Sequence, residues 1–461
     1  MTILPATRTA PSEKSKKRWP NKYAWFVVSL LLLAYTLSFI DRTIINLLVD
    51  PIRSDLQISD TQVSLLMGFS FVLFYVSLGI PIARLADRYS RRNIIIIAVV
   101  FWSIMTALCG FAKTFVMLFL ARIGVGAGEA GLSPAAYSLI SDYFPSNRVC
   151  RAISIYSVAV PLGTGLAYII GASLISAMSS WDTMTLPFIG EMKPWQLIFV
   201  IVSLPAVILV PLLTLISEPE RKGVHKDYIA ESKGTADNAS GLIAFMRLRR
   251  KVILGHLLGF SLISAADYAF LSWVPTFYFR VRGISLEETG VMFGLAYIIF
   301  GAAGLVVGAR LSELMQSKGL HDAIFRISAW VASLLFVFIW LIILLPHYWS
   351  YVALIVYIFL ISVPWGIAAG AIQLFTPNQY RAQLSALYLF SVSLAGMTIG
   401  PTGVALITDF FFQNDAKVGL SLAILSSICL AGAVAALLLC RKDFYDAVAA
   451  QLELEIKSNS R

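Results

Sequence analysis

The sequence predicts an all-α membrane protein with twelve transmembrane helices in two six-helix halves, and three observations support this fold class. Apolar residues make up 58% of the 461-residue chain and charged residues only 13%, a balance far from that of soluble domains. Apolar stretches long enough to cross a hydrocarbon core of about 30 Å recur from Ala24 almost to the end. A long polar segment divides these stretches into two sets of six.

The spans are expected to be helices, because a lipid-exposed backbone must satisfy its own hydrogen bonds and no stretch alternates like a barrel strand. The first span is too long for the apolar core of a signal peptide and lacks a small-residue cleavage site. The predicted spans are 24–49, 62–86, 93–112, 115–142, 150–178, 195–216, 252–279, 287–313, 323–345, 350–376, 382–410 and 417–440.

The polar segments predict the domain organisation. The tail is expected to be an amphipathic helix, because Phe444, Val448 and Leu452 recur at helical spacing. The units are an N-terminal cytoplasmic segment (1–23), a first half (24–216), a charged cytoplasmic loop (217–251), a second half (252–440) and a cytoplasmic tail (441–461).

The basic residues predict the orientation. Most of the 36 Lys and Arg residues fall in segments on the side of the N-terminus, so both termini are expected in the cytoplasm and the chain in the cell inner (plasma) membrane. This rule also accounts for most of the net charge of +10, so no nucleic-acid partner is expected. The four cysteines have unrelated spacings, so we expect no disulfide framework, metal or cofactor. We expect a monomer surrounded by membrane lipids.

The two halves carry an internal repeat. One gapless offset aligns "IARLADR" (82–88) with "GARLSEL" (308–314) and Asp41 with Asp267. Two parallel six-helix repeats are typical of secondary transporters that rock about a site near the middle of the membrane.

Several motifs resemble a known family. "ARLADRYSRRN" (83–93) resembles the loop after the second helix of the major facilitator superfamily, although Ser90 replaces the usual glycine. "SFIDRTIINLL" (38–48), "ARIGVGAGEAG" (121–131) and "YSVAVPLGTGLAYIIG" (156–171) together resemble its spinster lipid transporters, as a bacterial member. The resemblance implies the major facilitator fold, alternating access by rocking halves, a lysolipid- or sphingolipid-type amphiphilic substrate and proton coupling. Antiport, symport and uniport stay open as modes of transport.

The fourth span contains a glycine pattern that matches a dinucleotide fingerprint at Gly126, Gly128 and Gly131. No strand precedes it, and a phosphate needs free helix N–H groups that a span interior lacks. We therefore interpret Gly124 and Gly128 as a helix-packing motif. Bending or close packing is also expected in the fifth span, at Pro161, Gly163 and Gly165. We expect no enzyme. A membrane-bound NAD-dependent activity is only a remote alternative, because no segment outside the spans is long enough to form a nucleotide-binding domain.

Among the ionisable residues within predicted spans, Asp41, Arg42 and Glu129 stand out. An intramembrane charge is a functional hypothesis by default, and burial disfavours the charged form of a carboxylate. Asp41 and Glu129 are therefore candidate proton carriers, with Arg42 as their switch, and the resemblance implies the same roles. Two alternatives stay open: Arg42 could hold an anionic head group, and Glu129 could be a structural partner of an arginine.

Candidate substrate contacts follow from helices one, four, seven and ten, which line the cavity in the superfamily that the chain resembles. A structural role for Asp267 stays open. The candidates are Arg42, Glu129, Asp267, Tyr268 and Gln373. Two alternative activities of the same superfamily also stay open, an organic-anion:proton symporter and a drug:proton antiporter.

The basic loop after the second span resembles the superfamily's cytoplasmic latch, which forms in the outward-facing state. Positive-inside topology accounts for some of its arginines but not for Asp87. The predicted latch residues are Arg84, Asp87, Arg88, Arg91 and Arg92, with Arg310 and Glu313 as the weaker counterpart in the second half.

Overall fold

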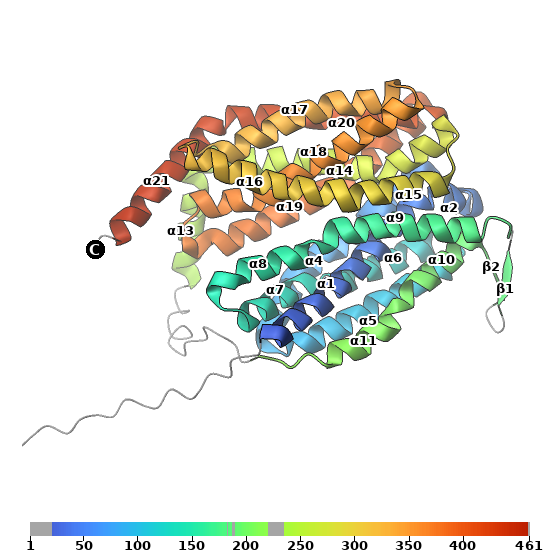
Figure 1. The fold of residues 1–461 in the computed structure, drawn as a ribbon, viewed down its shortest axis with the longest axis horizontal. Coiled ribbons are helices and arrows are strands. Elements are labelled where there is room, and N and C mark those ends of the chain that lie inside the picture. Colours follow the sequence, from blue (N-terminus) through green and yellow to red (C-terminus); the bar gives the residue numbers. More distant parts are fainter. Residues whose placement is uncertain (1–20, 182, 187–189, 220–234, 460–461) are drawn as a thin grey trace, which may run out of the picture.

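The computed structural model describes residues 21–459 except 182, 187–189 and 220–234, so most of the predicted N-terminal segment lies outside it. In the described part, twelve helical segments are long and apolar enough to cross a membrane. Figure 1 shows them in two groups, one for each half of the chain. Helix α1 begins and α21 ends at the same end of the bundle, which we call the terminal end; we call the opposite end the distal end.

The first half contains six spans, several of them built from two or three consecutive helical segments. Short helix α2 lies between the first and second spans. The elements are α1 (Asn21–Thr43) with η1 (Ile44–Leu47); α2 (Val49–Leu56); α3 (Asp60–Ser64), η2 (Leu65–Phe69) and α4 (Ser70–Arg88); α5 (Arg91–Gly110); α6 (Phe115–Glu129) and α7 (Leu132–Tyr143); α8 (Ser146–Ser157) and α9 (Ala159–Ala177); and α10 (Pro194–Ser203) and α11 (Pro205–Thr214).

The second half contains the remaining six spans and the C-terminal helix. Helix α14 alone extends over 33 residues. The elements are α14 (Arg250–Arg282); α15 (Leu286–Ala296), η4 (Tyr297–Gly301) and α16 (Ala302–Ser317); α17 (Ala323–Leu344); α18 (His347–Phe375); α19 (Asn378–Leu406) with η5 (Ile407–Phe412); η6 (Asp415–Lys417) and α20 (Val418–Leu439); and α21 (Arg441–Asn459).

Polar segments outside the spans also contain regular structure. The predicted inter-half loop includes helix α13 (Thr235–Leu248), and strands β1 (Met184–Leu186) and β2 (Gly190–Met192) form an antiparallel hairpin at the distal end. The tail helix α21 buries Phe444, whose ring stacks on Phe325 with centroids 4.2 Å apart. The tail is therefore attached to the second half.

Helical irregularities interrupt spans that hydropathy predicts as continuous. The first span tightens from an α-helix to a 3₁₀-helix at Ile44, and the second contains a π-helix at Leu65–Phe69. Such changes release backbone carbonyl groups from the regular i to i−4 pattern. In the fifth span the helix is interrupted at Val158, three residues before Pro161, which lacks the N–H that a continuous helix needs.

The two halves approach most closely where small residues face each other. A Cβ atom on Gly294 of α15 would lie 2.4 Å from the carbonyl oxygen of Gly165 in α9, and one on Gly165 would lie 2.5 Å from that of Gly294. On the other side of the bundle, a Cβ on Gly68 would collide with the backbone of Met397 in α19. Backbone contact of this kind is typical of helices packed in lipid.

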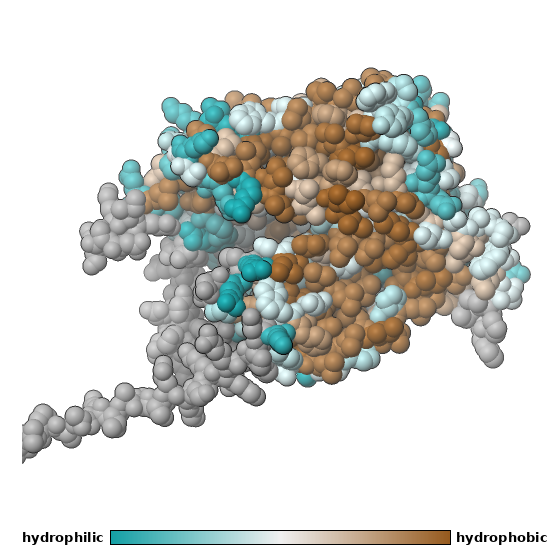
Figure 2. All heavy atoms as spheres, viewed as in Figure 1, coloured by the Kyte–Doolittle hydropathy of each residue, from teal (hydrophilic) through white to brown (hydrophobic). Residues whose placement is uncertain are grey.

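The surface agrees with a multi-pass membrane protein. Figure 2 shows a broad apolar belt over the flanks of the helices, with hydrophilic residues gathered toward the terminal and distal ends. Large apolar side chains such as Val207 and Ile208 of α11 are 70% exposed within this chain. Lipid tails, rather than water, are the environment that such a surface fits.

The Gly165–Gly294 contact yields a first prediction. Substituting Gly294→Ala should force α9 and α15 apart, and overpacking of this kind costs about 1–3 kcal/mol. We expect a roughly tenfold or larger shift toward a state in which the distal end is open. Spin labels at Ser59 and Glu287 would report it as longer distances. Gly370→Ala, where the new methyl group meets nothing within 4 Å, is the control; identical distances in both variants would contradict the prediction.

Candidate functional site

A buried ion pair joins the first and fourth spans. Arg42, at the end of α1, donates from Nη2 to Oε2 of Glu129 at 2.6 Å, and Ser38 Oγ donates to the same oxygen at 2.6 Å. The Glu129 side chain is completely buried, and only 9% of the Arg42 side chain is exposed. The predicted proton-coupling residues Arg42 and Glu129 are therefore in direct contact.

Aromatic rings surround the Arg42 guanidinium. Its Cζ lies 4.7 Å from the ring centroid of Phe39, 4.4 Å from that of Phe71 and 4.9 Å from that of Tyr75. These faces attract the cation but offer no acceptor for its N–H groups, and Arg42 Nε has no hydrogen-bond partner. The guanidinium therefore retains a donor that a bound anion could use.

Asp41 lies beside this pair and is 2% exposed. No ion pair involves its side chain within the described residues, and its Oδ1 atom lacks a hydrogen-bond partner, as does Oε1 of Glu129. Asp41 interacts electrostatically with both Glu129 and Arg122. The site thus holds two carboxylates, each with an unused oxygen, around two arginines.

Among the described residues, Arg122 of α6 pairs with no carboxylate and instead binds backbone carbonyl groups. It donates from Nε to Leu66 O at 3.2 Å, from Nη1 to Asp41 O at 3.1 Å and from Nη2 to Arg42 O at 3.2 Å. Leu66 lies in the π-helix of the second span, and Asp41 and Arg42 lie in the last turn of α1, directly before the 3₁₀-helix of the first span. Arg122, which is fully buried, therefore fixes the backbone that carries Asp41 and Arg42. Together we call Asp41, Arg42, Arg122 and Glu129 the charge cluster.

Of the predicted contacts of the second half, Asp267 and Tyr268 are adjacent in α14, and Gln373 of α18 lies apart from them. The Oδ2 atom of Asp267 accepts a hydrogen bond from Trp365 Nε1 at 2.9 Å. Tyr268, the next residue of α14, lies within electrostatic reach of Arg42 across the boundary between the halves. Gln373 is exposed toward the terminal end of α18 and donates to Ser385 Oγ at 3.1 Å.

Two of the predicted latch arginines bind acids of the first half and of the residues that directly follow it. Arg91, which is 1% exposed, pairs with Asp142 of α7 and with Glu218 after α11, the latter at 2.7 Å. The backbone N–H of Arg92 donates to Glu218 at 3.0 Å. Burial alone would raise the pKa of Glu218, but hydrogen bonds from Arg92 N–H, Arg91 and Ser90 outweigh it and lower that pKa.

The other latch residues make few contacts in this conformation. Arg84 and Arg88 are exposed, and the side chain of Asp87 lies outside the described side chains. Within the part of the chain that the structure describes, Arg310 bonds Glu313 of the same helix at 3.1 Å, and both side chains are largely exposed. A latch between the halves stays a prediction for another conformation.

The predicted packing residues lie against neighbouring helices. A Cβ atom on Gly124 would lie 2.5 Å from Met105 Sδ, and one on Gly128 would lie 2.7 Å from Trp102 Cβ; both neighbours belong to α5. A Cβ on Gly163 would lie 2.6 Å from Phe39 Cβ of α1. The glycines of "GVGAGEAG" therefore bring α6 against α5 while Glu129 faces Arg42.

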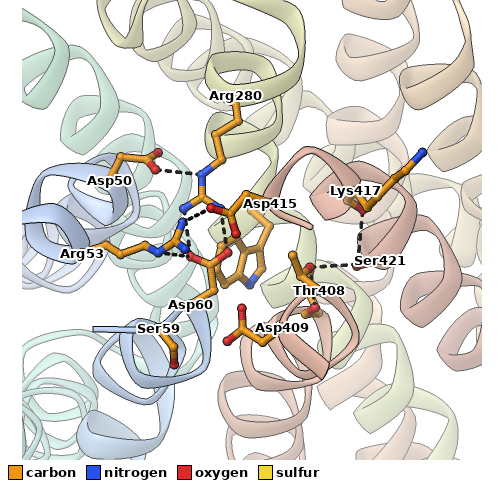
Figure 3. Close-up of polar contacts among 12 residues, drawn as sticks. Asp50, Arg53, Ser59, Asp60, Arg280, Thr408, Asp409, Asp415, Lys417 and Ser421 are labelled. Atoms are coloured by element: carbon orange, nitrogen blue, oxygen red, sulfur yellow. Dashed lines mark hydrogen bonds and ion pairs between the residues drawn. The ribbon is translucent and has the colours of Figure 1, made fainter. Parts of the chain in front are cut away.

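A network of ion pairs closes the distal end, as Figure 3 shows. Arg280 of α14 binds both oxygens of Asp60, at 2.6 and 2.9 Å, and Asp50 at 2.7 Å. Arg53 pairs with Asp415 of the second half. We call Asp50, Arg53, Asp60, Arg280 and Asp415 the distal network.

The distal network joins the two halves and is supported by an adjacent bond. Asp409 Oδ2 accepts hydrogen bonds from the N–H and the hydroxyl of Thr61, both at 2.7 Å. Burial raises the pKa of Asp50, and Arg280 offsets only part of that effect. The sequence alone did not single out Arg53 and Arg280, although the acids that end neighbouring spans on the same side were a usable signal.

Comparison with known proteins places these features in a family. Residues 31–401 match the model of the Major Facilitator Superfamily. An MFS-type efflux pump of Mycolicibacterium smegmatis is 30% identical over 418 residues, which cover 88% of this chain and 89% of the pump. The sphingosine-1-phosphate transporter SPNS2 of Xenopus tropicalis is 26% identical over 429 residues, covering 88% and 79% of the two chains.

A solved structure shares the whole architecture. The crystal structure of a bacterial homologue of the human lysosomal transporter spinster, inward-facing and unoccupied, matches with a TM-score of 0.73 and 26% identity, covering 94% of this chain and 99% of the other. The resemblance to spinster transporters, predicted from three motifs, is therefore confirmed.

Arg280 yields a prediction about the distal network. Arg280→Gln removes the main cation of the fully buried Asp60 and of Asp50, whose side chain is 24% exposed. Breaking a buried pair such as Arg280–Asp60 costs about 3–5 kcal/mol. We expect a cysteine at Ser64, which is fully buried in the helix that carries Asp60, to react with a membrane-impermeant maleimide about tenfold faster or more. Arg282→Gln is the matched control, because Arg282 bonds only carbonyl groups of its own half, those of Ile343 and Leu345. Equal labelling of the two variants would refute a closing role for Arg280.

Glu218 yields a pH-dependent prediction. Because its pKa is lowered, its stabilising bonds are present at neutral pH and are lost as the pH falls through that lowered pKa. Glu218→Gln should lower the melting temperature by about 2–4 °C at pH 7. The difference between variant and wild type should shrink as the pH falls below the ordinary range of a glutamate and vanish once the pH is below the lowered pKa of Glu218. Glu313→Gln is the control: its partner Arg310 is exposed, so the melting temperature should equal that of wild type at both neutral and low pH. A melting temperature of Glu218→Gln equal to wild type at pH 7 would contradict this account.

Proposed function

This chain belongs to the Major Facilitator Superfamily, and we propose that it is a proton-coupled transporter of an amphiphilic lipid or lipid-like compound. Its family and fold are those of spinster-like transporters rather than of enzymes. The observation that carries the proposal is the buried Arg42–Glu129 pair with Asp41 beside it. Charges held in the membrane interior are costly and mark ion or proton pathways.

Protonation would change the contacts of Arg42. The ionised Glu129 carboxylate accepts the short bond from Arg42, whereas a proton on Glu129 removes its charge and weakens that bond. Glu129 Oε1 and Asp41 Oδ1 have no hydrogen-bond partners, so a proton can add without displacing an existing bond. Arg42 is then released to bind an anionic group, which links proton uptake to substrate binding.

The surroundings of Arg42 favour an amphiphile. A guanidinium between Phe39, Phe71 and Tyr75 presents a cationic donor within an apolar wall, which suits a phosphate attached to a hydrocarbon chain. The sphingosine-1-phosphate transporter among the relatives supports the same substrate class.

We propose a rocker-switch motion with both termini in the cytoplasm. In that orientation the distal network closes the outer side, so the conformation faces inward, like that of the crystal structure that it matches. Opening the outer side would break the distal network, and the predicted latch, with Asp87 and Arg88, would form at the inner side. The chain would act as a monomer.

A second candidate is drug:proton antiport, favoured by the 30% identical efflux pump. Transport by purified protein in liposomes would separate the candidates. The panel would contain lysolipids, organic anions and cationic drugs, each with and without an imposed pH gradient. The proposal expects lysolipid movement that the gradient accelerates. Transport of drugs alone, or lysolipid transport indifferent to the gradient, would overturn it.

Glu129→Gln tests the coupling residue directly. The amide cannot gain or lose the proton, so lysolipid transport should lose its response to the pH gradient, by about tenfold or more. Glu288→Gln, an exposed residue at the distal end of α15, is the control and should behave like wild type. A Glu129→Gln variant that still responds to the gradient like wild type would exclude Glu129 as the proton carrier.

A further inference from the structure

Glu129 is so deeply buried that a proton that adds to it needs a route through the protein. The exposed fraction of its side chain is 0%, and that of its partner Arg42 is 9%. The charged groups that face Glu129 are the other members of the charge cluster, which are also buried. A proton carrier in this position therefore depends on further polar groups for contact with solvent.

Hydroxyl side chains continue from Glu129 toward the terminal end. Ser133 and Tyr137 follow Glu129 at intervals of four residues, and α6 and α7 form a single span. Residues four apart lie on the same face of a helix, with their Cβ atoms about 5–6 Å from each other. Tyr137, the member farthest from Glu129, is 37% exposed. The row therefore extends from the buried carboxylate to an exposed tyrosine.

Tyr156 of α8 packs against this row and joins it to the first span. Its side chain is fully buried, and its hydroxyl lies 3.3 Å from Ser133 Oγ. Its ring centroid lies 5.4 Å from that of Tyr137 and 4.7 Å from that of Tyr35 in α1. The Tyr35 hydroxyl is also within hydrogen-bonding reach of Ser133. Ser133 therefore contacts tyrosine hydroxyls from two other helices.

These hydroxyls approach Glu129 from both helices that hold it. Tyr35 precedes Ser38 by three residues of α1, and Ser38 Oγ donates to Glu129 Oε2 at 2.6 Å. Within the described part of the chain, Glu129 Oε1 has no hydrogen-bond partner, so it is available to accept a proton. A hydroxyl group can donate its own proton while it accepts another, so none of these side chains needs to ionise. We call Tyr35, Ser133, Tyr137 and Tyr156 the hydroxyl row.

We propose that the hydroxyl row carries protons between the terminal end and Glu129. This inference rests on the proposed function, because it needs Glu129 as the proton carrier. A proton from solvent adds to the Tyr137 hydroxyl, whose own proton passes by way of Tyr156 to Ser133. Ser133 or Tyr35 then delivers a proton to Glu129 Oε1, and deprotonation follows the same path in reverse. The charge cluster thus exchanges its proton with the terminal side while the distal network is closed.

Variants that remove one hydroxyl and keep the ring test this relay in liposomes. Tyr156→Phe should slow lysolipid uptake driven by a pH gradient about tenfold, because a positioned proton-transfer group is lost. Lysolipid exchange without a gradient should change by less than about twofold, because it needs no net proton transfer. Ser133→Ala should behave like Tyr156→Phe, and Ser133→Thr, which keeps the hydroxyl, should retain most of the gradient-driven rate. Tyr348→Phe, at a 69% exposed position at the distal end, is the control and should equal wild type.

The outcomes separate this inference from the proposed function. If wild type shows no gradient-driven lysolipid uptake, the proposed function fails, and the relay fails with it. If wild type responds to the gradient and Tyr156→Phe responds at the same rate, the relay is overturned and the proposed function stands. Equal losses of gradient-driven uptake and of gradient-free exchange would also overturn the relay, because they indicate a packing role. Should Tyr156→Phe not fold, equal gradient-driven rates in Ser133→Ala and Ser133→Thr would contradict the relay.

Discussion

A charge within the hydrocarbon layer persists only where the protein supplies a compensating charge or dipole, and the first half is organised around this constraint. Glu129 compensates Arg42, and carbonyl groups of two irregular spans compensate Arg122. These carbonyls are available because α1 tightens after Thr43 and the second span contains a π-helix. The irregular backbone and the charges therefore depend on each other, and removing either leaves the other unsatisfied.

The two halves differ in the buried charged residues that they carry. The first half carries arginines, carboxylates and the glycine surfaces that seat α6 against α5, whereas the second half carries Asp267, which accepts a bond from Trp365. Between them, backbone contacts at Gly165 and Gly294 and the distal network hold one end of the bundle closed. The glycine contacts can separate without exposing large buried side chains. The arginines of the distal network stabilise the closed distal end electrostatically.

The fold was largely predictable, because hydropathy and charge report directly on the bilayer. The seventh span, predicted at 252–279, appears as a helix from Arg250 to Arg282. The irregular segments that begin at Ile44 and Leu65 were not predictable, since the mean hydropathy of a span carries no information on its hydrogen-bond pattern. Asp41, Arg42 and Glu129 stood out as intramembrane charges, but their pairing depends on helix rotation. The distal network was missed because Asp50 and Arg280 are far apart in the chain and meet only in three dimensions.

The central claim is that a proton on the charge cluster controls which end of the bundle is open. Spin labels at Ser141 of α7 and Ser317 of α16 would measure the separation of the halves at the terminal end as the pH is varied. The account predicts a distance distribution that shifts with pH in wild type and is fixed in Glu129→Gln. A Glu129→Gln variant whose distances follow the pH as those of wild type do would contradict it.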